Sequence, residues 1–207
     1  MSVTMCVGMA MVILIFVGGS QRKWFVLLII LIAIAIPLLI LLEPYRIKRF
    51  LAFLNPWENP KDEGYQLIQS YYALGSGGLF GVGLFASRQK YLFLPFAESD
   101  FIFSVIGEET GLFGCVIVIL IFAALIICGI RIAMKAQDRF TSLLAAGLTS
   151  IIALQTIINI AVVTGSIPPT GLPLPYVSAG GTGLAAFMFV SGLLHNCSTV
   201  TKSLLMP

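Results

Sequence analysis

The sequence predicts an all-α polytopic membrane protein with about five transmembrane helices and a long extracytoplasmic loop that contains short amphipathic helices. The 207 residues are 58% hydrophobic and 10% charged, and their mean hydropathy is +1.02. About a quarter of the residues in a soluble domain are charged, so this chain is expected to lie in lipid. Its apolar stretches are continuous runs and not short alternating segments, which excludes a transmembrane barrel. The net charge of +3 gives no reason to expect a nucleic-acid partner.

Five apolar runs are long enough to cross a hydrocarbon core of about 30 Å, which takes about 20 helical residues. Residues 1–43 hold two of them, residues 44–100 form the long loop, and residues 101–207 hold the other three and a short cytoplasmic tail. No Lys or Arg precedes Arg22, so the first run is interpreted as a span and not as a cleaved signal peptide. The runs are Val3–Gly19, Trp24–Leu42, Phe101–Ile130, Phe140–Thr164 and Tyr176–Asn196.

The basic residues of the short connections all lie on one side of this predicted bundle. They occur in the turn at Arg22 and Lys23, in the turn from Arg131 to Arg139, and in the tail at Lys202. The N-terminus and the turn at 165–175, on the other side, carry no Lys or Arg. The positive-inside rule therefore places the C-terminus in the cytoplasm and the long loop outside the cytoplasmic membrane, although that loop itself holds several cations.

The long loop is predicted to begin with an amphipathic helix over Tyr45–Leu54. Arg46 and Arg49 are three residues apart and share one face, and apolar side chains form the other face. Such a helix lies in the membrane interface with its cations at the level of the headgroups. Two interpretations of the arginines remain open, namely an anchor without a ligand and a grip on the phosphates of a lipid substrate.

A second short helix is predicted over Gly64–Leu74, and a glycine-rich segment, Gly75 to Gly83, follows it. This segment is not a Walker loop, because no Gly-Lys-Ser/Thr sequence follows. It also lacks the preceding strand and the later acidic residue of a dinucleotide-binding turn. The interpretation that remains is close backbone packing at membrane depth, where irregular chain must be covered by protein.

Three carboxylates lie where the loop enters the third run. Asp100 occupies the expected N-cap position of that helix, so capping and a functional role are both open. Glu108 and Glu109 lie two turns further along, inside an apolar run, where a carboxylate is either buried with a donor or functional. Asp100 and Glu108 would be about 12 Å apart along a helix, which is too far for a glycosidase-like acid–base pair.

The last loop, Gly165–Tyr176, contains four prolines and two glycines and is predicted to follow an irregular, re-entrant path. Gln155 and Asn159 are four residues apart in the fourth run, a spacing typical of interhelical hydrogen bonds. The single histidine, His195, lies near the other end of the bundle, so no serine–histidine–acid set can form on the loop side. The four cysteines have no metal-ligand spacing and are interpreted as small buried side chains.

These motifs together resemble the FtsW/RodA/SpoVE (SEDS) family of cell-wall polymerases, with details closer to the FtsW branch. The resemblance extends from about residue 45 into the last span, and the order and spacing of the motifs also agree. The matching strings are YRIKRFLAFLNPW (45–57), GYQLIQSYYALGSGGLFGVGL (64–84), SRQK (87–90), DFIFSVIGEETGLFG (100–114) and TGSIPPTGLPLPYVSAGG (164–181).

The resemblance implies a peptidoglycan glycosyltransferase that polymerises lipid II during cell division, beside a class B penicillin-binding transpeptidase and other membrane proteins of the divisome. The family's essential acid corresponds to Asp100, which would be the general base on the attacking sugar hydroxyl. Arg46, Arg49 and Lys90 are the expected partners of the undecaprenyl-pyrophosphate leaving group. A divalent cation, Mg²⁺ or Mn²⁺, would also stabilise that anion, but the sequence holds no dedicated ligand cage. Further substrate contacts are expected from Gln69, Ser70, Glu108, Glu109, Gln155 and Ser178.

The chain also departs from the family pattern. Phe96 and Glu98 stand where the family has a glutamate and a histidine, Ser99 replaces a threonine, and Ala179 replaces an aromatic residue. The resemblance covers about the C-terminal half of a family member, so we expect a fragment that is inactive on its own. Two alternatives stay open: a lipid II transporter, for which no inverted repeat is visible, and a non-catalytic membrane partner of the transpeptidase.

Overall fold

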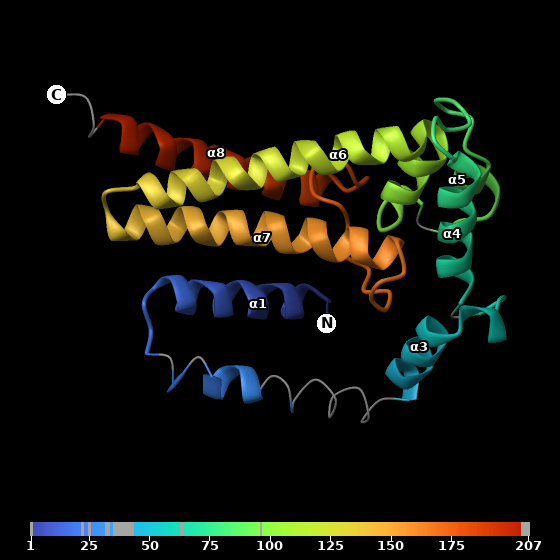
Figure 1. Ribbon diagram of the computed structural model, residues 1–207, viewed down its shortest axis with the longest axis horizontal. Coiled ribbons are helices and arrows are strands. Elements are labelled where there is room, and N and C mark those ends of the chain that lie inside the picture. Colours follow the sequence, from blue (N-terminus) through green and yellow to red (C-terminus); the bar gives the residue numbers. More distant parts are fainter. Residues whose placement is uncertain are drawn as a thin grey trace.

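The computed structural model describes residues 2–21, 23, 24, 26–31, 34, 44–62, 64–95 and 97–203. Three of its helices are long and apolar enough to cross a membrane, and they lie lengthwise beside one another (Figure 1). A shorter apolar helix, α1, packs along α7. The predicted all-α polytopic class is confirmed, and the described residues form no strand. The bundle helices are α1 (Ser2–Val17), α6 (Ile102–Lys135), α7 (Arg139–Val163) and α8 (Gly181–Ser203).

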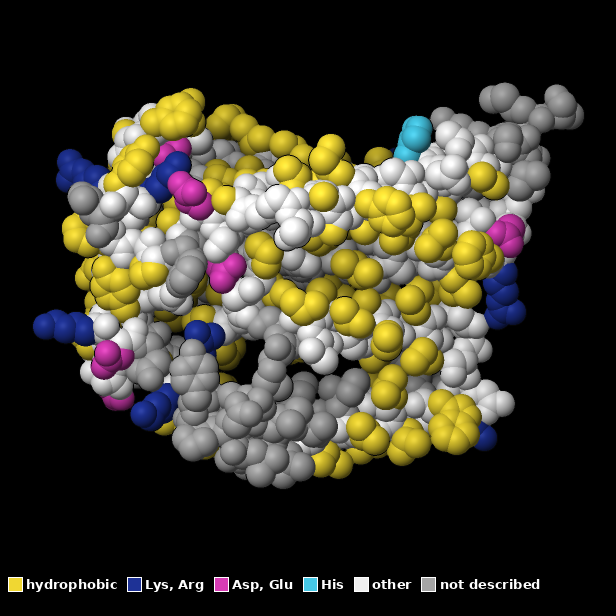
Figure 2. Space-filling view, turned by 180° about the vertical axis from the view of Figure 1, so that it is seen from behind, with side chains coloured by type: hydrophobic (Ala, Val, Ile, Leu, Met, Phe, Trp, Pro, Cys, Tyr) yellow, Lys and Arg dark blue, Asp and Glu magenta, His cyan; other side chains and the backbone are white. Residues whose placement is uncertain are grey.

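Most charged side chains of the described residues lie toward the two ends of this bundle, because a charged side chain in the hydrocarbon core is costly. On the face shown in Figure 2, Lys, Arg, Asp and Glu side chains gather toward the ends, and hydrophobic side chains occupy much of the band between them. At one end Asp138 caps α7 by accepting from the backbone N–H groups of Phe140 and Thr141, at 3.2 and 2.7 Å. The hydrogen bonds to Thr141 and Phe140 lower the pKa of this carboxyl. Arg139 donates to the carbonyl oxygen of Gly18 at 2.9 Å and so ties the end of α1 to the start of α7.

The described residues of the long loop form four short helices, which gather at the opposite end of the bundle (Figure 1). The two helices predicted for the loop are confirmed, with α4 ending three residues later than expected. The short helix α5 was not predicted. The loop helices are α3 (Pro44–Leu54), η1 (Pro56–Glu58), α4 (Tyr65–Gly77) and α5 (Arg88–Leu92).

Three predicted span boundaries are wrong. The helix α6 continues to Lys135 and not only to Ile130. The helix α8 begins at Gly181 and not at Tyr176, and it continues to Ser203 and not only to Asn196. Tyr176 has a φ of 64°, a left-handed conformation that cannot continue into a helix. Most of the predicted span Trp24–Leu42 lies outside the described residues.

The glycine-rich segment packs its backbone closely against a kink in α6, which confirms the predicted close packing, but several of its side chains are exposed and not covered by the described protein. Gly111 interrupts that helix with φ 70° and ψ −168°. The N–H of Val82 donates to the carbonyl of Glu108 at 2.9 Å, and the N–H of Leu112 donates to the carbonyl of Gly78 at 2.9 Å. A Cβ atom on Gly77 would lie 1.9 Å from the carbonyl oxygen of Gly107, so α4 and α6 meet at a distance that only glycine allows.

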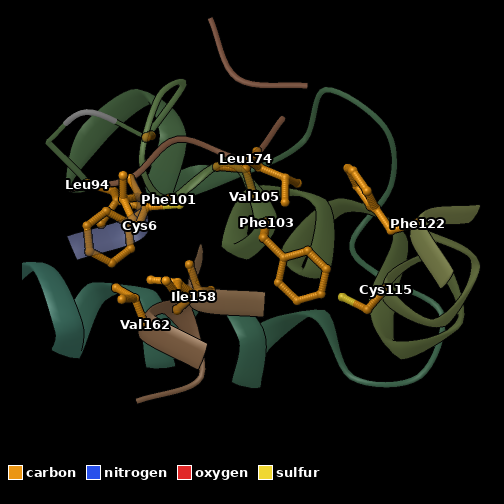
Figure 3. Close-up of a cluster of buried hydrophobic side chains, with 13 residues drawn as sticks. Cys6, Leu94, Phe101, Phe103, Val105, Cys115, Phe122, Ile158, Val162 and Leu174 are labelled. Atoms are coloured by element: carbon orange, nitrogen blue, oxygen red, sulfur yellow. The ribbon is translucent and has the colours of Figure 1, made fainter. Parts of the chain in front are cut away.

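A buried apolar cluster joins the loop to the bundle (Figure 3). Phe103, Val105, Cys115 and Phe122 are the members from α6, Phe101 lies just before that helix, and Val162 belongs to the end of α7. Leu94 of the long loop and Cys6 of α1 lie beside Phe101 in this view. Because all these elements share one packed core, the chain on either side of Phe101 is held in a defined position.

Candidate functional site

Asp100 lies at the junction between the long loop and α6, two residues before the helix begins at Ile102. The N-cap position belongs to Phe101, and no side chain there makes a capping hydrogen bond. The predicted N-cap role of Asp100 is therefore wrong. Phe101 is drawn into the apolar core and is only 3% exposed, so the helix starts one residue later than the sequence indicated. The carboxyl of Asp100 is thereby not used to cap α6.

The surroundings of Asp100 act on its protonation in opposite directions. Burial raises the pKa of the carboxyl above its ordinary value, and this effect is the largest. A hydrogen bond with Ser99 and the positive charge of Arg49 on α3 lower the pKa, but they only partly offset burial. Asp100 is therefore a half-buried acid with a raised pKa and a cation nearby, which is the condition expected of a group that exchanges protons.

Two amide side chains of α7 hold the backbone around this carboxyl. Asn159 is 1% exposed, and its Nδ2 donates to the carbonyl oxygens of Asp100 and Leu172, at 2.8 and 2.7 Å. One turn earlier, Nε2 of Gln155 donates to the carbonyl oxygen of Pro173 at 2.9 Å. The two amides share a face as expected, but they bind loop carbonyls and not a neighbouring helix. Asn159 thus links the proline-rich loop to Asp100, and Gln155 gives the same loop a second bond to α7.

The segment after the proline-rich loop pairs with the chain immediately before Asp100. The hydroxyl of Ser178 donates to the carbonyl of Ser99 at 2.6 Å, and the N–H of Ala179 donates to the carbonyl of Glu98 at 2.7 Å. Gly171 lies against Asp100, since a Cβ atom there would be 3.3 Å from its Oδ2, and its φ is +68°. The loop that the sequence predicted to be irregular thus packs against one side of Asp100.

A cavity of about 390 Å³ opens between the loop helices and the proline-rich loop. It has a mixed, partly cationic wall, with Arg49 from α3 on one side and the turn before α4 on another. Because the charge of Arg49 also acts on Asp100, this residue connects the cavity to the candidate acid. The lining residues are Arg49, Lys61, Asp62, Tyr65, Gln66, Pro95 and Pro169.

The other predicted phosphate-binding cations have different placements. Lys90 lies on α5, and its Nζ is 3.8 Å from Oε1 of Glu98, which is itself largely exposed. This ion pair bridges α5 and the chain before Asp100, and an exposed pair of this kind adds little stability. Arg46 belongs to α3, but its side chain lies outside the described part of the structure. Phe96 also lies outside it.

The carboxylate of Glu108 binds residues of the long loop and does not face an open surface. It is 2% exposed and accepts from the hydroxyl of Ser87 at 2.5 Å and from the backbone N–H groups of Arg88 and Gln89, at 3.0 and 3.3 Å. These donors form the N-terminus of α5, where a negative charge is favourable. The expectation of a buried carboxylate satisfied by backbone donors is confirmed. Its neighbour Glu109 is half-buried, and no described residue forms a hydrogen bond with its Oε1.

Of the two predicted substrate contacts on α4, Ser70 lies inside the protein and Gln69 does not. Ser70 is 0% exposed and its hydroxyl bonds to the hydroxyl of Ser104 and the carbonyl of Val163, both at 2.8 Å. These bonds join α4 to α6 and α7, so Ser70 holds the helices together. Gln69, its neighbour, is half-buried.

Several residues around Asp100 were not among the predicted site residues. Asn159 was noticed only for its spacing from Gln155, and Gly171 only as part of a proline-rich loop. A glycine between prolines does signal a left-handed turn, but nothing in the sequence indicates that this turn meets Asp100. Lys61 and Gln66 carry no local signal beyond their polarity. No group of three or more His, Cys, Asp and Glu residues suited to a metal forms within the described ranges.

Comparisons with known proteins identify relatives over almost the whole chain. The sequence model of the FtsW/RodA/SpoVE family, described as "Cell cycle protein", matches residues 1–203. The chain is 46% identical over 191 residues to "Stage V sporulation protein E" of Bacillus subtilis, covering 92% of this chain and 52% of that protein. It is 41% identical over 191 residues to the "Probable peptidoglycan glycosyltransferase FtsW" of Geobacter metallireducens, with 92% and 51% covered. The chain therefore spans about half the length of these curated relatives.

A solved structure has a similar fold. It is described as "Structural coordination of polymerization and crosslinking by a peptidoglycan synthase complex", and the matched chain is 26% identical with a TM-score of 0.69. The match covers 94% of this chain and 53% of the other. The helical fold of this chain is thus shared with about half of a longer chain.

Proposed function

Because the chain belongs to the FtsW/RodA/SpoVE family of cell cycle proteins, we propose that it carries the base-bearing half of a peptidoglycan glycosyltransferase that polymerises lipid II. The single observation that carries this proposal is Asp100, a half-buried carboxyl with a raised pKa beside a cationic cavity. Relatives named as peptidoglycan glycosyltransferases support the reaction class. The matched region is half of such a relative, so the substrate site is proposed to need the other half as well.

In the proposed reaction the carboxylate of Asp100 takes the proton of the attacking sugar hydroxyl. The hydroxyl oxygen bonds to the anomeric carbon of the second substrate, and the bond from that carbon to the pyrophosphate oxygen breaks. A raised pKa makes Asp100 a stronger base than an ordinary aspartate, which suits this role. The undecaprenyl pyrophosphate leaves as an anion, and Arg49 and Lys61 in the cavity wall are the cations available to it.

We also propose that the chain works in the cytoplasmic membrane beside a class B penicillin-binding transpeptidase and other divisome membrane proteins, with the long loop outside the membrane. The similar solved structure is described as a complex that coordinates polymerization and crosslinking, which supports a partnership of this kind. The basic turn at Lys135 and Arg139 supports an orientation with this end in the cytoplasm.

The decisive experiment is to replace Asp100 in a chimaera in which this chain substitutes for its matching half of the Bacillus subtilis relative. Reconstituted with lipid II, the Asp100→Asn and Asp100→Ala variants should lose glycan polymerisation, whereas Glu58→Gln should keep it because Glu58 lies on the exposed helix η1. Asp100→Asn should not lower the Tm at neutral pH, because burial disfavours the charged carboxylate. Unchanged polymerisation in the Asp100 variants would refute the proposal, and so would lipid II transport without polymerisation.

A further inference from the structure

An unusual group of exposed apolar side chains follows α4. Leu79, Phe80, Leu84 and Phe85 are 65%, 84%, 70% and 78% exposed, and Val82 between them is 46% exposed. A contiguous apolar patch of this kind is rarely left in water and marks an interaction surface. We call these residues, 79–85, the apolar wedge.

The apolar wedge is fixed to α6 by its backbone. The N–H of Gly83 donates to the carbonyl of Glu109 at 3.1 Å, and the carbonyl of Leu79 accepts from the N–H of Phe113 at 3.2 Å. These bonds lie on either side of the Gly111 kink. Gly81 also lies against α6, since a Cβ atom there would be 2.1 Å from the carbonyl oxygen of Glu109. The exposed side chains therefore belong to a rigid backbone segment. That segment is held beside the Gly111 kink of the spanning helix α6.

The depth of the apolar wedge in the membrane can be inferred from the positions of the charged residues along α6. The helix has 34 residues, which corresponds to about 51 Å, whereas a hydrocarbon core is about 30 Å thick. The run from Leu112 to Ile130 contains no charged residue and is followed by Arg131. This run corresponds to about 28 Å of helix, so it is long enough by itself to cross the hydrocarbon core of the membrane. Leu112 then lies at the edge of the core, and the wedge lies beside that edge.

The exposed surface of α6 continues that of the wedge. Leu112 and Phe113 are 56% and 66% exposed, directly next to the carbonyl of Leu79 that binds Phe113. Arg88, also exposed, follows the wedge at the start of α5. Exposed apolar and aromatic side chains followed closely by a cation form the pattern of a segment that lies in the membrane interface.

We propose that the apolar wedge inserts into the adjacent leaflet of the bilayer, with Phe80, Leu84 and Phe85 among the acyl chains and Arg88 at the level of the phosphates. The partner is thus the lipid of the surrounding membrane and not another protein. Because Glu108 ties α5 to α6 beside the wedge, insertion also holds the loop close to the membrane surface. This proposal does not depend on the reaction proposed above.

The test uses tryptophan fluorescence in vesicles of phosphatidylcholine and phosphatidylglycerol whose acyl chains are brominated. The chain has two tryptophans, so the background carries Trp24→Phe and Trp57→Phe. Single tryptophans are then introduced by Phe80→Trp or Leu84→Trp. The lipid control is Ile121→Trp, at a position 63% exposed on α6, and the water control is Gln137→Trp, in the turn before α7.

Bromine quenches only on contact, so insertion predicts a loss of emission at positions 80 and 84 comparable to that at position 121, together with a blue-shifted maximum. The tryptophan at position 137 should keep its emission. Emission at 80 and 84 that resembles position 137 would overturn the proposal. A blue-shifted but unquenched signal would also overturn it, because protein and not lipid would then cover the wedge. Unchanged helical circular dichroism in all four variants establishes that the comparison is between folded proteins.

Discussion

Asp100 and Arg49 form the electrostatic centre of the proposed active site. Burial raises the pKa of Asp100, and the positive charge of Arg49 lowers it, so the two effects set the pH at which the base becomes available. A base acts only when it is deprotonated, so activity should fall as the pH falls through this raised pKa. The acid side of the pH profile therefore reports the environment of a single carboxyl.

We predict that Arg49→Gln moves the acid limb of the polymerisation profile to higher pH. Removing the cation withdraws a contribution that lowers the pKa of Asp100, so more of the carboxyl is protonated at a given pH. Lys48→Gln is the matched control, since it removes the same charge from an exposed neighbour on α3. The measurement is the pH dependence of lipid II polymerisation by the chimaera. Identical profiles for both variants would contradict the prediction.

Asn159 is predicted to be a positioning residue for Asp100. Asn159→Ala removes one buried and one partly buried hydrogen bond to loop carbonyls and should lower the free energy of unfolding by about 2 kcal/mol or more, with a loss of activity. Thr156→Val is the control on the same helix. Its hydroxyl bonds only to a carbonyl within α7, so the cost should be below about 1 kcal/mol. Equal losses in thermal unfolding would indicate that the loop contacts of Asn159 have no special role.

At the scale of elements, the absence of a side chain at glycine allows the backbones of α4 and α6 to come into close contact. Gly77→Ala would place a methyl group 1.9 Å from a backbone oxygen of α6 and should destabilise the protein by about 3 kcal/mol or more. Gly75→Ala, two residues earlier on the same helix, meets nothing within 4 Å and should stabilise by about 0.5–1 kcal/mol. Thermal unfolding in detergent distinguishes the two. Similar values would show that the helices do not approach as closely as described.

The carboxylate of Glu108 is predicted to hold α5 in place. Glu108→Gln puts an amide against backbone N–H donors and should cost about 2 kcal/mol, with faster amide hydrogen exchange at Arg88 and Gln89. Glu109→Gln is the adjacent control and should change stability by less than about 0.5 kcal/mol, since no described residue forms a hydrogen bond with its Oε1. Exchange rates that respond equally to both substitutions would contradict this assignment.

On the scale of the whole molecule, the segments that connect the bundle helices lie at two opposite ends of the bundle, as the sequence indicated. The turn between α6 and α7 lies at one end, and the loop helices and the end of α7 lie at the other (Figure 1). The basic residues near the first end favour a cytoplasmic location. This separation makes the orientation of the chain directly measurable.

We predict that a thiol introduced by Lys61→Cys reacts with a membrane-impermeant maleimide in intact cells, whereas one introduced by Gln137→Cys reacts only after lysis. The background lacks the four native cysteines, each replaced by serine or alanine. Both positions are exposed, so a difference in labelling reflects the side of the membrane. The reverse pattern would show that the long loop faces the cytoplasm.

The sequence by itself determined the features that depend on composition and local pattern. These are the helical membrane class, the two longer loop helices, the close packing of the glycine-rich segment and the candidate acid Asp100. Each follows from hydrophobic run length, amphipathic spacing or a family motif. The motif also indicated a role for Asp100 that local chemistry alone did not reveal.

Only the tertiary structure decided which groups surround that acid. Asn159, Gly171 and Arg49 come from α7, the proline-rich loop and α3, and their proximity depends on how distant segments pack. The start of α8 at Gly181 also depends on such contacts, since Ser178 and Ala179 use their polar groups on the chain before Asp100. Hydrogen bonds between remote segments leave no periodic signal in the sequence, and for this reason the environment of Asp100 could not be predicted from it.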